Sequence, residues 1–216
     1  MAQSLEVARA ALRSRQGGGA RYDVGNAPVR ELDWARRGTA YFARLLNGIG
    51  DMEFGKPSLL PMVSRRHIIT HVGYQARLLS EIVGWVRSNR DGHLPFKAEV
   101  DSEDVRQKVT LPARALRNLF VHSAVHLDVE WRDLSDAQWD TSVTDRNGQL
   151  IAIRETPRWR ASAIWSHAMD LGAGGRFDDM PLELADSLSE TSQDEIRRLP
   201  AAFFSHRPRK IGDHQQ

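Results

Sequence analysis

The segment PRWRASAIWSHAMDL, residues 157–171, constrains the fold of this chain more than any other stretch. Its small and apolar residues recur at the three- and four-residue spacing of one helix face, and His167 lies within that stripe. A second stripe of this kind, in residues 64–89, contains His71. Since facing helices hold metals in the cores of helical bundles, the two histidines predict a metal site between two helices. A hydrogen-bonded core role for each histidine is the alternative.

Helical segments and one hairpin are expected along the chain. The apolar period predicts helices at 28–49, 64–89, 113–134 and 157–171, with a further helix at 181–198. The period changes between 141 and 153, where Asn147-Gly148 is a strong signal for a hairpin turn. The pattern predicts an all-α antiparallel four-helix bundle with a small β-hairpin insertion before the fourth helix.

Three parts of the chain are expected to differ in role. Residues 1–26 are predicted to form an N-terminal appendage, because the glycines at 17–19 end any helix that precedes them. Residues 27–199 are predicted to contain the helical bundle, and residues 200–216 a polar C-terminal tail. The 216 residues are enough for one sizeable core.

Composition excludes several classes of function. The chain has no cysteine, which excludes disulfides, thiolate metal ligands and a cysteine nucleophile. The formal net charge is only +2, and basic and acidic residues are interspersed, so no nucleic-acid partner is expected. No apolar run reaches the roughly 18 residues of a membrane span, and the first residues lack the apolar segment of a secretory signal. We therefore expect a cytoplasmic protein with a small-molecule substrate and no membrane partner.

A resemblance to a known family lies in five runs of the sequence. They are ARRGTAYFARLL, EFGKPSLL, RRHIITHVGYQA, LRNLFVHSAVHLDVEWRDLSDAQW and RASAIWSHAMDL. These runs resemble the N-terminal domain of the mycothiol-dependent maleylpyruvate isomerases, which belongs to the wider DinB-like group of metal-binding four-helix bundles. The similarity extends over about residues 28–188 and implies a DinB-like fold for this chain.

The resemblance also implies a metal site. In relatives of this kind the metal is usually zinc, held by one histidine from the second helix and an ExxxH pair from the fourth. The two histidine positions match His71 and His167, whereas the glutamate position is occupied by Ala163, which has no donor atom. A carboxylate at that position would share a helix face with His167 and bind the same ion, so its absence leaves the family's ligand set incomplete.

Three alternatives for this site stay open at the level of sequence. In the first, another side chain replaces the glutamate, with His126 as the preferred substitute; His122 on the same helix and Asp170 are further candidates. In the second, two histidines hold the metal together with water or an external thiol. In the third, no metal is bound.

Further residues are candidates for binding substrate or orienting the ligands. His67 precedes His71 by one helical turn and Asp170 follows His167 by three residues, so each is expected to orient the histidine beside it. Family members commonly bind substrate through an arginine of a C-terminal domain. The candidates within this chain for substrate binding are Tyr74, Arg77 and Arg158, with Arg154 and Arg160 as alternatives near the fourth helix.

The resemblance implies an enzyme that depends on a thiol and a divalent metal. It would isomerise a small electrophilic metabolite related to an unsaturated acid, or add or transfer a thiol to it. The thiol is a low-molecular-weight cofactor such as mycothiol, in keeping with the absence of cysteine. Two alternatives stay open: a non-catalytic or metal-independent small-molecule-binding protein, and a lyase or cyclase of specialised metabolism on the same scaffold. A homodimer paired through an outer helix face also stays open.

Overall fold

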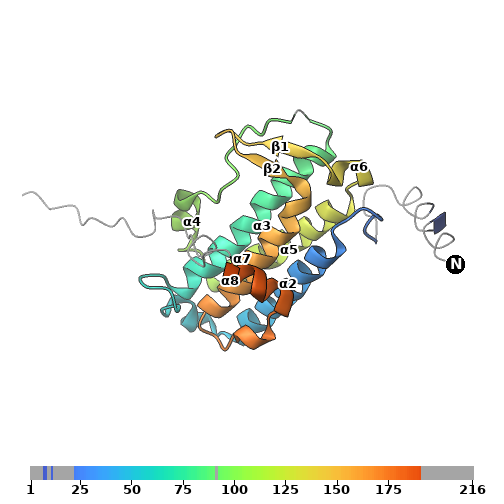
Figure 1. The fold of residues 1–216 in the computed structure, drawn as a ribbon. Helices are drawn as coiled ribbons and strands as arrows, with labels where there is room; N and C mark the ends of the chain where they lie inside the picture. Colours follow the sequence, from blue (N-terminus) through green and yellow to red (C-terminus); the bar gives the residue numbers. More distant parts are fainter. Residues whose placement is uncertain (1–6, 9–10, 12–21, 91, 191–216) are drawn as a thin grey trace, which may run out of the picture.

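Four long helices form a bundle in the computed structural model, which describes residues 7–8, 11, 22–90 and 92–190 (Figure 1). They are α2 (Val29–Gly48), α3 (Arg65–Arg87), α5 (Ala113–Arg132) and α7 (Thr156–Asp170). A two-stranded antiparallel sheet precedes the fourth of these helices. The predicted all-α bundle with a small hairpin insertion is therefore confirmed.

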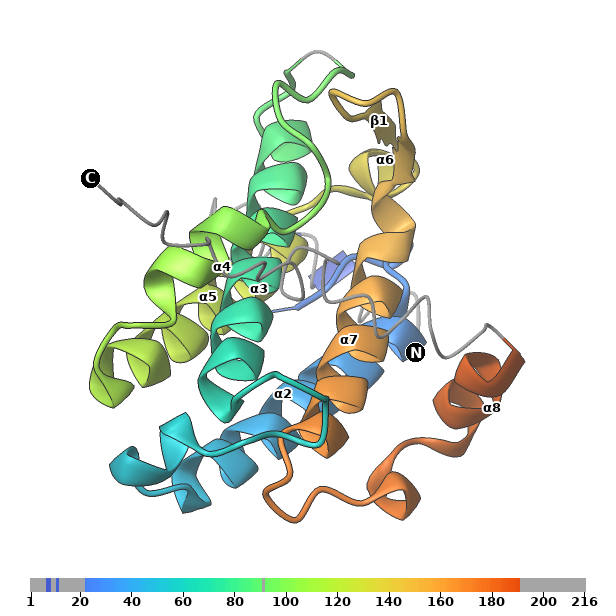
Figure 2. The ribbon, with the colours of Figure 1, turned by 90° about the vertical axis from the view of Figure 1, so that its left-hand side faces the viewer.

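The four helices associate as two closely packed pairs, α3 with α5 and α2 with α7. Glycine permits the close approach in each pair. A Cβ atom at Gly73 of α3 would lie 2.8 Å from the side chain of Leu119, and one at Gly38 of α2 would lie 2.7 Å from those of Ile164 and Trp165. The indole Nε1 of Trp165 donates to the backbone oxygen of Trp34 at 3.0 Å, across 131 residues of sequence. Figure 2 shows α2 crossing α7 at this interface.

The apolar stripes of the helices meet in one hydrophobic core. Phe42 of α2 and Phe120 of α5 stack with ring centroids 5.1 Å apart, and both are almost fully buried. Complete burial of a large apolar side chain stabilises a fold by roughly 1.5–3 kcal/mol, so the periodic residues account for the bundle. The predicted stripe of Ala163, Ile164, His167 and Ala168 in α7, with Leu171 at its C-cap, is buried.

Local sequence fixes where the site helices begin and end. At the start of α3 the backbone N–H of Ser64 donates to Nδ1 of His67 at 3.3 Å. Pro157 lies in the first turn of α7, where its missing N–H costs nothing. Gly172 ends that helix with a φ of +63°, a conformation that glycine adopts without strain. Arg65 Nε then donates to the backbone oxygen of Leu171 at 3.1 Å, which fastens the start of α3 to the end of α7.

Shorter elements connect the bundle helices. They are η1 (Asp51–Gly55), α4 (Ser102–Lys108), α6 (Asp136–Trp139), β1 (Ser142–Thr144), β2 (Leu150–Ala152), η2 (Ile153–Glu155), η3 (Phe177–Asp179) and α8 (Leu182–Glu190). Val143 pairs with Ile151 in the hairpin, and Gly148 in its turn has a φ of +82°. Pro112 separates α4 from α5, so the third helical region consists of two helices.

The ends of the predicted parts lie outside the described residues. This holds for the tail at 200–216, for the last residues of the helix predicted at 181–198, and for much of the appendage at 1–26. Within the described part of that appendage, Asp23 forms an ion pair with Arg36 of α2. No helix within the described residues is both long enough and apolar enough to cross a membrane.

Candidate functional site

Two histidines from different helices meet inside the bundle. His71 comes from α3 and His167 from α7, and their ring centroids are 5.1 Å apart with the planes at 82°. Both side chains are buried, His71 at 7% exposure and His167 at 1%. The sequence predicted that the two stripes would bring these histidines together between facing helices, and the geometry agrees with that expectation.

Asp170 lies beside His167 within the same helix. Its Oδ2 atom is 3.2 Å from Nδ1 of His167, and both side chains are buried. The backbone of Asp170 is also fixed, since its carbonyl oxygen accepts a hydrogen bond from Leu59 N–H at 2.8 Å. A carboxylate acceptor at this distance favours the His167 tautomer with its proton on Nδ1 and its lone pair on Nε2. The structure thus brings Asp170 into contact with His167, and its orienting role stays a prediction.

The ring of His71 is less well satisfied than that of His167. Its Nδ1 atom is buried and has no hydrogen-bond partner in the described part of the chain. Burial lowers the pKa of His71 well below its ordinary value, and the nearby His167 and Arg160 act in the same direction. The ring is therefore neutral at pH 7. Leaving a buried polar atom unpaired costs about 1–3 kcal/mol, so such an atom calls for a functional explanation.

Arg160 of α7 is a buried cation near this pair. Its Nη1 donates to the backbone oxygen of Val72 at 2.8 Å and to Oε1 of Gln75 at 2.9 Å, whereas Nη2 has no partner within the described residues. Burial lowers the pKa of Arg160 to about 9, so the guanidinium remains charged at pH 7. Sequence reasoning preferred Arg158, which is exposed. The missed signal is spacing, because Arg160 lies seven residues before His167 on the same buried stripe.

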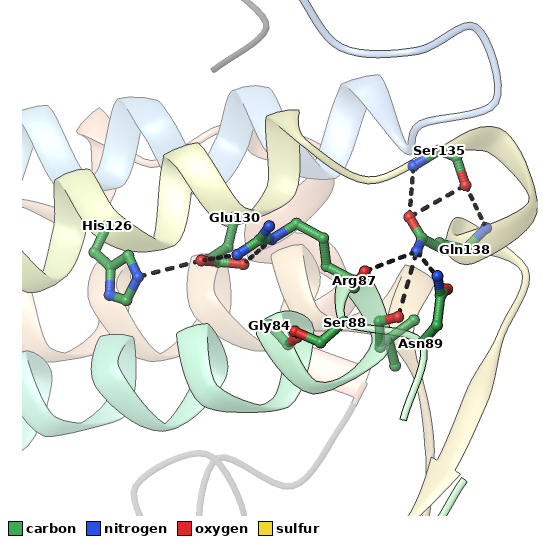
Figure 3. Close-up of polar contacts among 9 residues, drawn as sticks. Gly84, Arg87, Ser88, Asn89, His126, Glu130, Ser135 and Gln138 are labelled. Carbon is green, nitrogen blue, oxygen red and sulfur yellow. Dashed lines mark hydrogen bonds and ion pairs between the residues drawn. The ribbon is translucent and has the colours of Figure 1, made fainter. Parts of the chain in front are cut away.

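The predicted third metal ligand lies elsewhere. His126 of α5 has a side chain that is 61% exposed, and its Nε2 is 3.2 Å from Oε1 of Glu130. Glu130 in turn pairs with Arg87 of α3 at 2.7 Å (Figure 3). His122 is likewise exposed. The expectation that His126 replaces the missing glutamate is therefore corrected: its face of α5 points outward, where it joins a structural ion cluster.

The donor set does not fit a metal centre with three protein ligands. Ala163 is buried at the position where the family pattern has a carboxylate. In the described ranges, no three histidine, aspartate or glutamate side chains gather closely enough to hold a metal ion. His71 and His167 alone supply two nitrogens, one fewer than the three protein ligands of a typical catalytic zinc site.

Two of the predicted substrate-binding residues share a cavity. Tyr74 and Arg77 of α3 line a space of about 610 Å³ together with Phe96, Lys97 and Arg146. The Arg77 guanidinium carbon lies 5.4 Å from the centre of the Tyr74 ring. Burial raises the pKa of Tyr74, so its hydroxyl stays protonated and can donate. Tyr74 follows His71 by one helical turn, although neither histidine of the pair lines this cavity.

The remaining predicted residues have other surroundings. His67 caps the start of α3, with its Nδ1 also 2.7 Å from Ser64 Oγ, so this nitrogen is engaged at the helix end. Arg158 lines neither the cavity at Tyr74 and Arg77 nor a second cavity between α2 and α5. The orienting role of His67 and the substrate-binding role of Arg158 thus stay predictions, and the described contacts give neither one direct support.

The fold and the buried histidine pair define a helical-bundle protein with a polar centre between α3 and α7. Residues 35–172 match the family described as mycothiol maleylpyruvate isomerase N-terminal domain, and the chain belongs to that family. A search of curated proteins gave no match.

Two solved structures are similar to this chain. One is mycothiol-dependent maleylpyruvate isomerase, at 34% sequence identity and a TM-score of 0.68. The other is a histidine-to-alanine mutant of the mycothiol-dependent maleylpyruvate isomerase, at 33% identity and a TM-score of 0.68. Each similarity covers 75% of this chain and 68% of the relative.

Proposed function

We propose that this chain is a thiol-dependent, isomerase-like enzyme that acts on a small unsaturated acid related to maleylpyruvate. The observation that carries the proposal is the buried Nδ1 of His71, left without a described partner near the ring of His167. A core that retains such an atom gives up stability, which favours a role in binding or chemistry. Membership of the isomerase family supports the same class of reaction.

An external thiol such as mycothiol supplies the nucleophile, whose addition to a cis double bond permits rotation and then elimination to the trans product. His167 is the residue suited to take the thiol proton, because Asp170 holds the proton of Nδ1 and leaves Nε2 as the acceptor. The same proton returns to sulfur on elimination, so the ring ends in its starting state. Burial keeps His71 neutral, which leaves a second uncharged ring beside the reacting atoms.

The cavity at Tyr74 and Arg77 is the proposed site for the substrate carboxylate. A guanidinium binds a carboxylate through two parallel hydrogen bonds, and a protonated tyrosine adds a further donor. Tyr74 lies one helical turn after His71, so a small acid bound there has the histidine pair within a short reach along α3. Four acidic residues, Glu81, Glu99, Asp101 and Asp104, also line this cavity, beside the cations Arg77, Lys97 and Arg146.

The donor set for the zinc expected from the resemblance is incomplete, because His71 and His167 are present but Ala163 has no donor atom. Metal content of the chain purified without a histidine tag tests this directly, beside the variants His71→Ala and His167→Ala. We expect no stoichiometric zinc in any of the three proteins. About one zinc per chain, lost in both variants, would contradict this expectation and require a ligand other than His126.

A second candidate is a metal-independent small-molecule-binding protein on the same scaffold. The observation that favours it is Ala163, which removes the third donor while the two histidines remain buried together. Such a protein would bind an unsaturated acid without converting it. Binding measured in the absence of thiol, followed by an activity assay with thiol, separates the two candidates.

The activity test follows the isomerisation of maleylpyruvate by absorbance with and without mycothiol. We expect turnover that requires the thiol and falls by about 100-fold or more in His167→Ala, the typical loss on removing a general base. His126→Ala is the matched control, because it removes an exposed histidine that lies outside the pair. Absence of thiol-dependent turnover, or equal losses in both variants, would overturn the proposal.

A further inference from the structure

A second cavity, of about 440 Å³, lies between α2 and α5. These two helices are neighbours in the bundle (Figure 1), but they pack much less extensively than α3 with α5 or α2 with α7. Besides Arg36, the α2 wall has the small residues Ala35, Thr39, Ala40 and Ala43, which leave the space unfilled. Its volume falls within the range of small-molecule sites, about 300–1,000 Å³.

The outer wall of this cavity is apolar and open. Val121 and Val125 of α5 line it and are 51% and 59% exposed, although valine is among the residues most often buried. Phe120 and Ala124 lie beside them in the lining. Neither His71 nor His167 belongs to the lining, so this cavity is separate from the polar centre between α3 and α7. An apolar ligand would remove this surface from water.

The inner wall contains Arg160, a buried cation without a described counter-ion. Its side chain is 1% exposed, its Nη2 lacks a partner within the described residues, and Nη1 contacts only neutral oxygens of α3. Arginines at the edge of the cavity differ from it. Arg36 and Arg132 both pair with Asp128. A buried charge without an opposite charge is costly, which makes an anionic group the ligand chemistry that this wall favours.

We propose that the cavity between α2 and α5 binds a small amphiphilic monocarboxylate, with its carboxylate paired with Arg160 and its apolar body between the two helices. A single negative charge is specified because Arg160 has no acidic partner within the described residues, whereas Arg36 and Arg132 are paired with Asp128. The apolar body is specified by the alanine and valine walls. This site is independent of the proposed isomerase activity, since it needs neither the thiol nor the histidine pair.

The experiment uses three probes on the whole chain in isothermal titration calorimetry. Octanoate carries both the carboxylate and the apolar body, octanol lacks the charge, and acetate lacks the body. We expect octanoate to bind to one site, octanol to bind at least tenfold more weakly, and acetate not to bind. Equal affinity for octanoate and octanol would overturn the role of Arg160.

Three variants locate the site. Arg160→Met removes the charge at similar length, and Ala124→Phe fills the cavity from α5 while leaving Arg160 intact. Each is expected to weaken octanoate binding at least tenfold. Arg158→Met is the matched control, because it removes an exposed positive charge from the same helix, and its affinity should equal that of the unaltered chain. Thermal unfolding monitors folding, and Ala124→Phe decides the outcome if Arg160→Met fails to fold.

Other occupants of the cavity give distinct results. If octanoate does not bind, and Ala124→Phe converts a dimer to a monomer in sedimentation, the apolar face contacts a second copy of the chain and the proposal is wrong. Octanoate binding that persists in both Arg160→Met and Ala124→Phe would also overturn it, because the acid then binds elsewhere. Neither result bears on thiol-dependent turnover, so the two proposals fail separately.

Discussion

The histidine pair and the ion cluster on α5 contain similar side chains in opposite states. In the Glu130 cluster, formed by Arg87, His126 and Glu130, the carboxylate lies 2.7 Å from the Arg87 guanidinium and 3.2 Å from Nε2 of His126 (Figure 3). In the pair of His71 and His167, one ring nitrogen has no described partner although it is buried. The exposed His126 therefore has a polar partner in Glu130, whereas the buried Nδ1 of His71 has no described hydrogen-bond partner.

The two regions also differ in their exposure to solvent. Arg87 and His126 are 39% and 61% exposed, so water screens their attraction to Glu130, and exposed ion pairs contribute only about 0–1 kcal/mol each. His71 and His167 are instead buried in the protein. There an electrostatic interaction is stronger than in water, and an unpaired polar atom lowers the stability of the fold more. The comparison shows that the candidate site is identified by a buried ring nitrogen without a described hydrogen-bond partner, and not by the presence of histidine alone.

The largest expected effect comes from restoring the missing carboxylate. In Ala163→Glu the new side chain shares the face of His167, one turn before it on α7, and with His71 completes three protein ligands. We expect zinc content to rise from background to about one ion per chain, measured by elemental analysis after dialysis. Ala161→Glu is unsuitable as a control because Ala161 is fully buried, so Ser162→Glu, at a half-buried neighbour, is used. Equal zinc in both variants would contradict the prediction.

Removal of the carboxylate from the Glu130 cluster is the next largest change. Glu130→Gln keeps the shape of this buried residue but removes the negative charge that contacts both Arg87 and His126. Exposed ion pairs contribute about 0–1 kcal/mol each, so we expect the loss of both pairs to lower the free energy of unfolding in urea by up to about 2 kcal/mol. His126→Ala should cost less than about 1 kcal/mol. A larger loss in His126→Ala than in Glu130→Gln would show that the cluster is organised differently.

The third prediction concerns the pH dependence of stability, which His71 is expected to make steeper below pH 6.5. Burial lowers the pKa of His71 below the ordinary 6.5, so the unfolded chain binds a proton that the folded chain does not. The stability that the neutral His71 contributes is therefore fully present above pH 6.5. It is lost as the pH falls below that value, at up to about 1.4 kcal/mol per pH unit. Urea unfolding between pH 7 and pH 5 measures this slope, which should be smaller in His71→Leu. An unchanged slope in that variant would contradict the prediction.

The smallest expected effect is the stability of His71→Leu itself at pH 7. Replacing an unsatisfied buried ring with an apolar side chain should leave the free energy of unfolding unchanged or raise it by up to about 1 kcal/mol. His167→Leu provides the comparison, because it leaves the buried carboxylate of Asp170 without this partner and should destabilise the chain. If His71→Leu destabilises the chain as strongly as His167→Leu, His71 has a structural role and the comparison fails.

Periodicity predicted the helices and the hairpin because burial of one face is the dominant free-energy term in such a bundle. The same information sufficed to bring together His71 and His167, each on the buried face of its helix. It failed for His126. An i, i+4 spacing with His122 says that the two share a face, but the buried stripe of α5 runs through Leu116, Phe120 and Leu127 and excludes both.

The burial of Arg160 could have been predicted from the sequence, whereas the unpaired nitrogen of His71 could not. Arg160 was visible in principle, since Ile164 and Ala168 follow it on the same buried face, yet an arginine is usually taken as exposed. The unpaired Nδ1 of His71 could not be predicted from the sequence, because it depends on how α3 and α7 pack against each other. Hydrophobic pattern specifies faces, whereas the partners of a ring nitrogen depend on the final packing.

The pairing of α2 with α7 has a consequence for how the chain assembles. The contact between Trp34 and Trp165 closes a loop of 131 residues, whereas α3 and α5 are consecutive long helices of the bundle. Larger loops lose more chain entropy on closure, so we expect α3 and α5 to associate early and α7 to dock late. The histidine pair then exists only in the completed fold, and an intermediate that keeps α3 and α5 together is inactive.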